Sequence, residues 1–263
     1  MSTTADDKYI VPALQRGLEL LGTFNRDAQE QNGADLARKL DLPRASVFRM
    51  LHTLERAGFV ERVGDTANYR LGLGVLRLGF EYLASMELTE HGRPVIEELR
   101  DATGYSAHLV VRDKQQVVFI AKAAGRSALF HSIQVGARLP AHATVLGRML
   151  MADLDKKALT ELYPETPLPK FTERTPTTLA QLKAMIDAER AQGYAISQGG
   201  FETGISTIAA PVFNDRHEVV AAVSITVPAQ QVPMEQAQLL VPQVQQAAQL
   251  LTNRISHLPQ RSA

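Results

Sequence analysis

Residues 34–60 constrain the fold more than any other part of this 263-residue chain. Leu36 and Leu40 recur at helical spacing, and residues 41–43 then read Asp-Leu-Pro. Proline is accepted in the first turn of a helix, and it disfavours helical backbone at the residue before it. The segment therefore predicts a short helix, a tight turn and a longer second helix, which together form a helix-turn-helix.

The second predicted helix has one apolar and one polar face. Its apolar stripe, at spacings of three and four, consists of Val47, Met50, Leu51 and Leu54. On the polar face, arginine can present two parallel donors to guanine, and hydroxyls can bond a base or a phosphate. We expect DNA contacts from this helix and the following hairpin at Arg44, Ser46, Val47, Arg49, His52, Thr53, Arg62 and Arg70, with Val47 included although it also belongs to the stripe.

Residues 59–71 predict the wing of a winged helix. Gly58 ends the second helix, and residues 59–63 and 68–71 alternate like two strands around a turn at 64–67. The combination indicates double-stranded promoter DNA as the partner. One alternative stays open, because helix pairs joined by short turns are common: the unit is a packing module that contacts another protein.

The charge balance limits how tightly one copy can bind DNA. The chain has 28 Lys and Arg against 28 Asp and Glu, so no net field attracts nucleic acid. Residues 34–70 carry seven basic and five acidic side chains. With so small an excess, useful affinity requires two copies acting together.

Composition excludes several kinds of site. Cysteine is absent, which removes disulfides, thiolate zinc sites, iron–sulfur clusters and thiol nucleophiles. The N-terminus lacks the apolar core of a signal peptide, and the longest apolar runs, such as residues 219–223, are too short to cross a bilayer. We expect a cytoplasmic protein with no cofactor, no metal and no membrane partner.

Periodicity divides the chain into three parts. A helix over residues 11–24 opens a DNA-binding domain at 9–71. A linker helix follows at 72–88, where Leu73, Leu76, Phe80 and Leu83 form a stripe that suits packing against a second copy. Residues 89–257 form the last domain.

The residue pattern of the last domain predicts helices that flank a strand-rich sheet, in an α+β arrangement. The expected helices cover residues 89–101, 143–152, 156–162, 179–192 and 234–256. The expected strands cover residues 107–111, 117–123, 130–135, 195–198, 206–212 and 219–227.

Three segments together resemble the IclR-type bacterial transcription regulators: the winged helix ending at residues 51–60, the block at 136–147, and residues 205–213 with 219–226. The resemblance spans residues 11–256. It implies an N-terminal winged helix-turn-helix, a linker helix used in dimerisation, and a C-terminal GAF-like domain that binds a small metabolite. It also implies a homodimer or homotetramer that controls a catabolic operon.

The resemblance further implies where the effector binds. Its positions fall on Val145, Leu146, Ser197, Thr207, Ser224 and Thr226, to which we add His131 and, with less weight, His108. Hydroxyls can bind a carboxylate, while Val145 and Leu146 form an apolar wall. Some relatives have small residues at Val145 and Leu146 and an aspartate at Ser197. The bulkier and uncharged side chains of this sequence favour a small aromatic acid over a short oxo acid.

An enzyme on the same GAF-like fold is the remaining alternative. The sequence has no glycine-rich phosphate loop, no nucleophile elbow and no metal-ligand spacing, so we expect no catalytic residues. A Ser206 or Ser224 nucleophile with a distant histidine stays formally open. The sequence leaves the effector's identity, the operator, and activation or repression undetermined.

Overall fold

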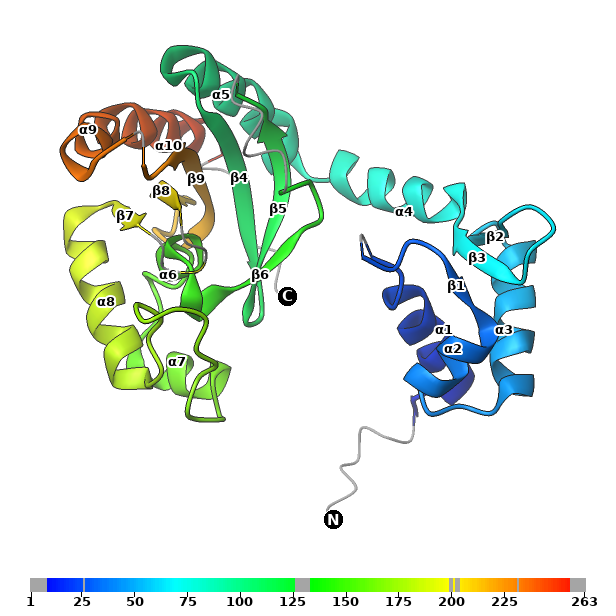
Figure 1. The fold of residues 1–263 in the computed structure, drawn as a ribbon. Helices are drawn as coiled ribbons and strands as arrows, with labels where there is room; N and C mark the ends of the chain where they lie inside the picture. The colour runs from blue at the N-terminus through cyan, green and yellow to red at the C-terminus, as the bar shows by residue number, and fades with distance from the viewer. Residues whose placement is uncertain are drawn as a thin grey trace. The chain divides into compact units, whose positions relative to one another are not determined.

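The computed structural model describes residues 9–25, 27–125, 133–198, 201, 204–230 and 232–255. The chain divides into two compact units, Met1–Ser85 and Met86–Ala263, and each is described by itself. The architecture is α+β (Figure 1).

The N-terminal unit is a winged helix-turn-helix. A three-stranded antiparallel sheet in the order β1-β3-β2 packs with the helices, and β1 is a strand that the sequence did not predict. The elements are α1 (Pro12–Gly22), β1 (Gln31–Asn32), α2 (Gly33–Lys39), α3 (Arg44–Arg56), β2 (Val60–Arg62), β3 (Asn68–Leu71) and α4 (Leu73–Ala84).

Local signals explain the helix-turn-helix. The Asn32 side chain caps α2 by accepting hydrogen bonds from the backbone N–H groups of Ala34 and Asp35. Asp41, in the turn, takes the left-handed backbone conformation (φ 52°) that aspartate tolerates better than most residues. Pro43 precedes α3 as its N-cap. The core beneath consists of Leu20, Phe24, Leu36, Ala37, Val47, Leu51, Val60 and Tyr69.

Two glycines fit the start of α4 against the end of α3. The Gly74 N–H donates to the Gly58 carbonyl at 2.8 Å. A Cβ at Gly72 or Gly74 would lie 2.5 or 2.7 Å from that carbonyl oxygen, too close for any side chain. These residues therefore permit a close backbone approach that any side chain would prevent.

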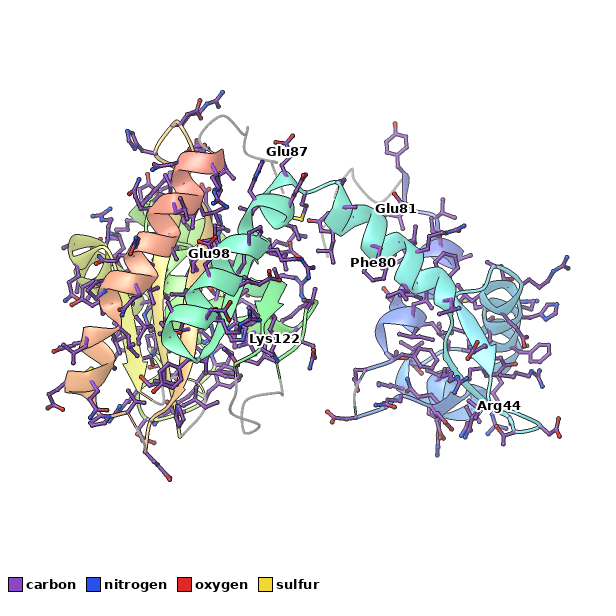
Figure 2. All side chains as sticks on the ribbon, turned by 90° about the horizontal axis from the view of Figure 1, so that it is seen from above. Arg44, Phe80, Glu81, Glu87, Glu98 and Lys122 are labelled. Carbon is purple, nitrogen blue, oxygen red and sulfur yellow. The ribbon has the colours of Figure 1, made fainter. Side chains whose placement is uncertain are left out.

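The N-terminal unit leaves two helices with exposed apolar side chains. Within the described residues α4 buries no side chain, and α1 buries only Leu20. Leu14 and Leu18 of α1 are exposed. The exposed apolar side chains of α4 are Leu73, Leu76, Leu78, Phe80 and Tyr82, and Phe80 is labelled in Figure 2.

The C-terminal unit is built on a six-stranded antiparallel sheet in the order β6-β5-β4-β9-β8-β7. Its strands are β4 (Ser106–Asp113), β5 (Gln116–Ala123), β6 (Arg138–Pro140), β7 (Ala195–Gln198), β8 (Ile205–Phe213) and β9 (Val219–Pro228). Its helices are α5 (Glu87–Thr103), η3 (Ala141–Ala143), α6 (Val145–Met149), α7 (Lys156–Leu162), α8 (Leu179–Gln192), α9 (Met234–Leu239) and α10 (Val241–Ile255).

The helices cover both faces of the sheet (Figure 1). On one face Leu109 meets Gly92 of α5, which also approaches Leu251 of α10. On the other face Val110 and Ala209 join a buried cluster with residues of α6, α7 and α8. The two faces therefore have separate cores. Because successive side chains of a strand point to opposite faces, alternate residues enter alternate cores.

Several predicted elements need correction. Of the strand expected at 130–135, residues 133–135 form no strand and the rest lies outside the described residues, whereas β6 forms where no strand was predicted. The helix expected from Thr89 begins at Glu87 and runs through the exposed Pro94, where water can satisfy the freed carbonyl. The helix expected over 234–256 is two helices, because Pro242 starts a second one.

Candidate nucleic-acid interface and effector site

The polar face of α3 is exposed and organised by its own hydrogen bonds. Arg44, Arg49, His52 and Thr53 are exposed and Ser46 is half-buried, and Arg44 projects outward in Figure 2. Arg49 Nη2 lies 3.5 Å from Ser46 Oγ, and Thr53 Oγ1 donates to the Arg49 carbonyl at 2.8 Å. Within the described residues, neither Arg44 nor Arg49 forms an ion pair with an acidic side chain, so both guanidinium groups are available to a duplex.

Val47 corrects one sequence expectation. Its side chain is completely buried in the core of the N-terminal unit, in contact with the cluster that holds Leu51 and Leu36. A side chain that faces this core cannot touch a base edge. Its place in the apolar stripe, and not its place in the first turns of the helix, decides its role.

Phe48 is a surface residue that the sequence reasoning missed. Its ring is 58% exposed and stacks on His52, with 6.5 Å between ring centroids. An apolar side chain among major-groove readers can contact a thymine methyl group. The available signal was an aromatic residue lying off the stripe of Val47, Leu51 and Leu54.

The arginines of the wing differ from those of α3 because they already have acidic partners. Arg62 Nε lies 3.6 Å from a Glu55 carboxylate oxygen, and its guanidinium also lies over the Tyr69 ring at 5.3 Å. Arg70 Nε donates to Glu61 at 2.6 Å. Both arginines are exposed and so is Glu61, while Glu55 is half-buried. Such pairs are weak and can exchange for phosphate contacts, but they offset the positive charge of the wing.

In the C-terminal unit, the strand register gathers the predicted hydroxyl residues on one face of the sheet. Thr226 of β9 lies between Thr207 of β8 and Ser106 of β4, and Thr207 pairs in turn with Ser197 of β7. A second row, two residues along, joins Ser224 of β9 to His108 of β4. We call this side of the sheet the effector face, defined by Ser106, His108, Lys122, Ser197, Thr207, Ser224 and Thr226.

Val145 and Leu146 are buried in the cluster that covers the same face. They open α6, whose N-cap Thr144 accepts a hydrogen bond from the Gly147 N–H at 3.1 Å. Helix α6 packs against β8, β9 and β5. The apolar wall and the hydroxyl rows therefore belong to one layer of the domain.

A buried ion pair fixes α6 to α8. Arg148 is only 3% exposed, and its Nη2 and Nε donate to the two Glu189 carboxylate oxygens at 2.7 and 2.8 Å. This two-point contact holds the helix that carries Val145 and Leu146 in one orientation.

Two histidines were predicted near the effector, and only one can be placed. His131 lies outside the described residues. His108 is 2% exposed and directly opposite both Ser224 and Lys122 in the register. Burial, and secondarily the positive charge of Lys122, lower the pKa of His108 to about 3, so its imidazole is neutral at physiological pH.

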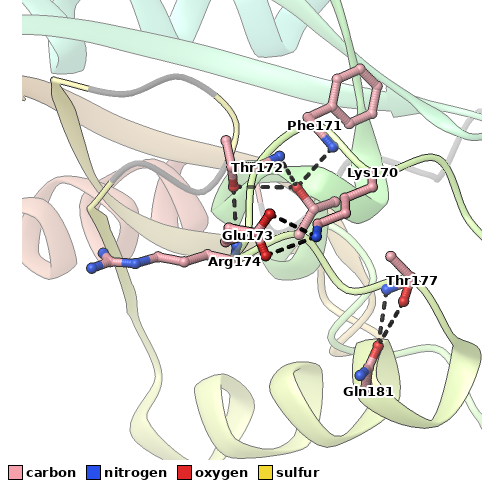
Figure 3. Close-up of polar contacts among 8 residues, drawn as sticks. Lys170, Phe171, Thr172, Glu173, Arg174, Thr177 and Gln181 are labelled. Carbon is pink, nitrogen blue, oxygen red and sulfur yellow. Dashed lines mark hydrogen bonds and ion pairs between the residues drawn. The ribbon is translucent and has the colours of Figure 1, made fainter.

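A loop beside α6 adds aromatic side chains that the sequence did not single out. Thr175 Oγ1 accepts from the N–H groups of Phe171 and Thr172 at 3.2 and 2.8 Å, which shapes the loop shown in Figure 3. The Phe171 ring lies 5.9 Å from His142 of η3 and 5.0 Å from Phe201. These rings link the segment just before Val145 to the segment that connects β7 and β8.

A hollow of about 280 Å³ lies elsewhere in this unit, between the C-terminal end of α8 and the middle of α10. Its lining includes Met149, Phe213, Gln245 and Gln249, and none of the predicted effector residues. Its lining contains none of the buried polar atoms that lack a partner, whereas the effector face contains His108 and Ser224. Unsatisfied polar groups are the stronger sign of a ligand, so we place the candidate site on the effector face.

Among the described residues, no group of three His, Asp or Glu side chains is arranged to hold a metal ion. No helix in the same part of the chain is long and apolar enough to span a membrane.

Comparison with known proteins decides the family. Residues 13–64 match the IclR helix-turn-helix domain, and residues 80–253 match the C-terminal domain of the bacterial transcriptional regulator IclR. The chain belongs to the IclR family. It is therefore a DNA-binding transcriptional regulator of that family and not an enzyme.

Individual IclR relatives cover nearly the whole chain. The HTH-type transcriptional regulator XynR of Escherichia coli K12 is 30% identical over 94% of this chain and 98% of its own length. A transcriptional regulator structure from Rhodococcus sp. RHA1 is 32% identical, covers 95% of this chain and all of its own, and superposes with a TM-score of 0.83. An IclR homologue from Microbacterium hydrocarbonoxydans, solved with 4-hydroxybenzoate, is 25% identical. The match covers 93% of this chain and 99% of the homologue, with a TM-score of 0.80.

Proposed function

We propose that this IclR-family protein is a ligand-responsive regulator of a catabolic operon that senses a small organic acid, with an aromatic acid favoured. Residues 9–71 bind promoter DNA and residues 89–257 bind the effector, and the helix at residues 72–88 links these two domains. The protein acts in the cytoplasm, where a bacterial promoter lies. The observation that carries the proposal is the convergence of Ser197, Thr207, Ser224 and Thr226 on one face of the sheet.

For the DNA contact, we place α3 in the major groove. Arg44 and Arg49, which have no acidic partner within the described residues, read base edges together with Ser46, His52 and Thr53. Phe48 adds an apolar contact from the same surface. Arg62 and Arg70 of the wing contact phosphates after releasing Glu55 and Glu61.

Two copies are needed to bind a promoter, in a homodimer or homotetramer. The excess of positive charge in the winged unit is small, so one copy binds DNA weakly. Two linked DNA-binding units raise the overall affinity, because the second contact is intramolecular. The exposed apolar side chains of α4 and α1 supply a surface for this association, because such a patch is unfavourable in water.

For the effector, the chemistry of the face suits an acid with a flat apolar body. Hydroxyls in two rows offer hydrogen bonds, and Val145 and Leu146 supply the apolar side of the same layer. The Microbacterium relative, solved with 4-hydroxybenzoate, supports an aromatic acid. The ligand changes DNA affinity only through its different affinities for the two arrangements of the winged heads, with the 72–88 linker as the connecting element.

The test is footprinting on the promoter adjoining the protein's own gene, with and without 4-hydroxybenzoate and benzoate. We expect a protected site whose occupancy changes at least fivefold with one of these acids. Increasing salt should weaken the protection steeply, because phosphate contacts release counterions. Absence of any protected site at low salt would contradict the proposed DNA binding, and protection that neither acid changes would contradict the proposed aromatic effector.

A further inference from the structure

One aromatic side chain on the polar face of α3 has no place in the core of the N-terminal unit. Phe48 is 58% exposed, whereas the preceding residue, Val47, is completely buried. Within the described residues, Phe48 belongs neither to the core cluster of this unit nor to the partly buried apolar side chains packed against it. A single exposed apolar residue is ordinary on a protein surface. The neighbours and the orientation of this ring give it a more specific meaning.

Positive charge lies on both sides of Phe48. Arg44 lies one helical turn before it and Arg49 directly after it, and both arginines are exposed. In the part of the chain that the structure describes, neither arginine forms an ion pair with an acidic side chain. A protein partner that covered the ring would also have to desolvate these charges, whereas a duplex supplies phosphates and guanine acceptors for them. DNA is therefore the occupant that matches the whole surface.

The ring of His52 restricts the orientation of Phe48. The two residues are four apart on α3, and their rings are parallel to within 4° with 6.5 Å between the centroids. His52 Nδ1 lies 4.0 Å from a Glu55 carboxylate oxygen, so His52 also has a neighbour on the next turn. An aromatic side chain that is already ordered loses less conformational entropy when it binds. The stack therefore presents an apolar surface of defined orientation among the hydrogen-bonding groups of this helix.

The major groove offers one apolar group to such a surface. In unmodified DNA, thymine presents its 5-methyl group beside the O4 acceptor, and phenylalanine is one of the side chains that contact this methyl group. Arginine instead bonds O6 and N7 of guanine. Side chains four residues apart are separated by about 6 Å along a helix, and successive base pairs by about 3.4 Å. Phe48 and Arg44 therefore suit bases that lie about two base pairs apart.

We propose that Phe48 contacts the 5-methyl group of an operator thymine that lies about two base pairs from a guanine read by Arg44, and that His52 positions the phenyl ring. This inference rests on the proposed contact of α3 with the major groove. It makes Phe48 a specificity-determining residue and His52 a positioning residue. The protein then distinguishes thymine from uracil, which has the same hydrogen-bonding edge and lacks only the methyl group.

The test is fluorescence anisotropy titration of the full-length protein on the duplex that footprinting identifies, with one thymine at a time replaced by deoxyuridine. At one or more thymine positions the wild-type affinity should fall about fourfold, as expected when one buried methyl group is lost. Phe48→Ala should bind the thymine and deoxyuridine duplexes equally at those positions. Phe48→Leu, which keeps an apolar side chain, should retain part of the preference for thymine.

The same preference tests His52. His52→Ala should lower the preference for thymine over deoxyuridine and leave binding to a scrambled duplex unchanged, because only the orientation of the Phe48 ring is lost. His52→Phe, which restores a stacked ring, should keep the preference. Equal weakening of His52→Ala on all duplexes would overturn the positioning role.

Leu71→Ala is the matched control. Leu71 is 41% exposed and belongs to the same unit, but it lies on β3 of the wing. Its variant should keep the wild-type preference for thymine. Replacing the nearby guanine by 7-deazaguanine, which lacks the N7 acceptor, should weaken the wild type and Phe48→Ala alike and leave Arg44→Ala unaffected. Thermal melting checks folding, and Phe48→Ala should melt within about 4 °C of the wild type because its ring lies outside the core.

The outcomes separate this inference from the proposed function. If the wild type binds the duplex specifically and no deoxyuridine substitution weakens it, the inference is overturned while the major-groove contact stands. If Phe48→Ala keeps the wild-type preference for thymine, another side chain reads the methyl group and the inference is again overturned. The same holds if that variant only changes the oligomeric state in sedimentation, because the ring then covers a second copy. If the wild type binds no specific site, the inference fails together with the proposed DNA binding.

Discussion

The two candidate sites of this protein are built in opposite ways. The DNA surface consists of exposed side chains from one short stretch of α3 and its hairpin, and the partners of its charges are visible as exposed ion pairs. The effector face consists of buried and half-buried side chains from five strands that are distant in sequence. An exposed polar side chain without a ligand is solvated by water and costs little free energy of folding, whereas a buried one without a hydrogen bond destabilises the fold. The first kind of site must therefore be tested by binding and the second also by stability.

The largest expected difference concerns ion pairs. Glu189→Ala should lower the free energy of unfolding of the C-terminal unit by about 3 kcal/mol, because it leaves the buried Arg148 without its carboxylate. Glu61→Ala, which removes the exposed partner of Arg70, should change stability by less than about 0.5 kcal/mol. Urea unfolding of each variant measures both changes in the free energy of unfolding. Equal changes would contradict the expected difference between a buried and an exposed ion pair.

The next effect concerns promoter recognition. Arg49→Ala should weaken binding to the specific site by about 2 kcal/mol, roughly thirtyfold, and leave nonspecific binding nearly unchanged, because a base-reading donor is lost. Arg70→Ala should weaken both kinds of site by a smaller and similar factor, because it removes a phosphate contact that Glu61 already offsets. Gel-shift titrations against specific and scrambled duplexes distinguish them, and full retention of discrimination by Arg49→Ala would count against the recognition surface.

A smaller effect is expected at the junction of α3 and α4. Gly74→Ala should destabilise the N-terminal unit by between about 1 and 2 kcal/mol, because its Cβ would collide with the Gly58 carbonyl oxygen. Gly79→Ala is the control on the same helix, since nothing lies within 4 Å of its Cβ position, and it should be neutral or stabilising by up to about 1 kcal/mol. Thermal unfolding of the two variants tests this, and equal melting temperatures would contradict it.

The smallest effect is a pH dependence from His108. Its pKa is about 3 in the folded protein and near 6.5 in the unfolded chain, so the unfolded state binds the extra proton as pH falls through this window. The folded state should lose about 1 kcal/mol of stability between pH 7.5 and pH 5.5 from this group. His108→Phe should remove that part of the loss in urea titrations at the two pH values, and an unchanged dependence would show that His108 is not buried and neutral.

The winged unit was predictable because its signals are local. Pro43 and the spacing of the leucines in α2 and α3 specified the helix-turn-helix, and the alternation at 59–71 specified the hairpin. The errors arose where contacts at a distance override local preference. Val47 is buried in the same cluster as Leu36 and Leu20, which are distant in sequence, and the strand β1 forms by pairing with β3.

The C-terminal unit shows the same division more strongly. The strands β5, β7, β8 and β9 follow their predicted segments closely, since apolar runs bounded by turns mark them. The strand β6 carries no such run and forms by pairing with β5, and Pro242 divides a helix that periodicity alone made continuous. Phe171 and Phe201 meet only through the loop that Thr175 organises.

The sequence alone determined most of the segments that become helices and strands, and the chemical character of each face, because periods of 3.6 and 2 residues are set within the segment. Only the tertiary structure decided that Ser197, Thr207, Thr226 and Ser106 form one row, and that His108 meets Ser224 without a hydrogen bond. The reason is that strand register is fixed by pairing between distant segments, and a shift of one residue would send every one of these side chains to the other face of the sheet.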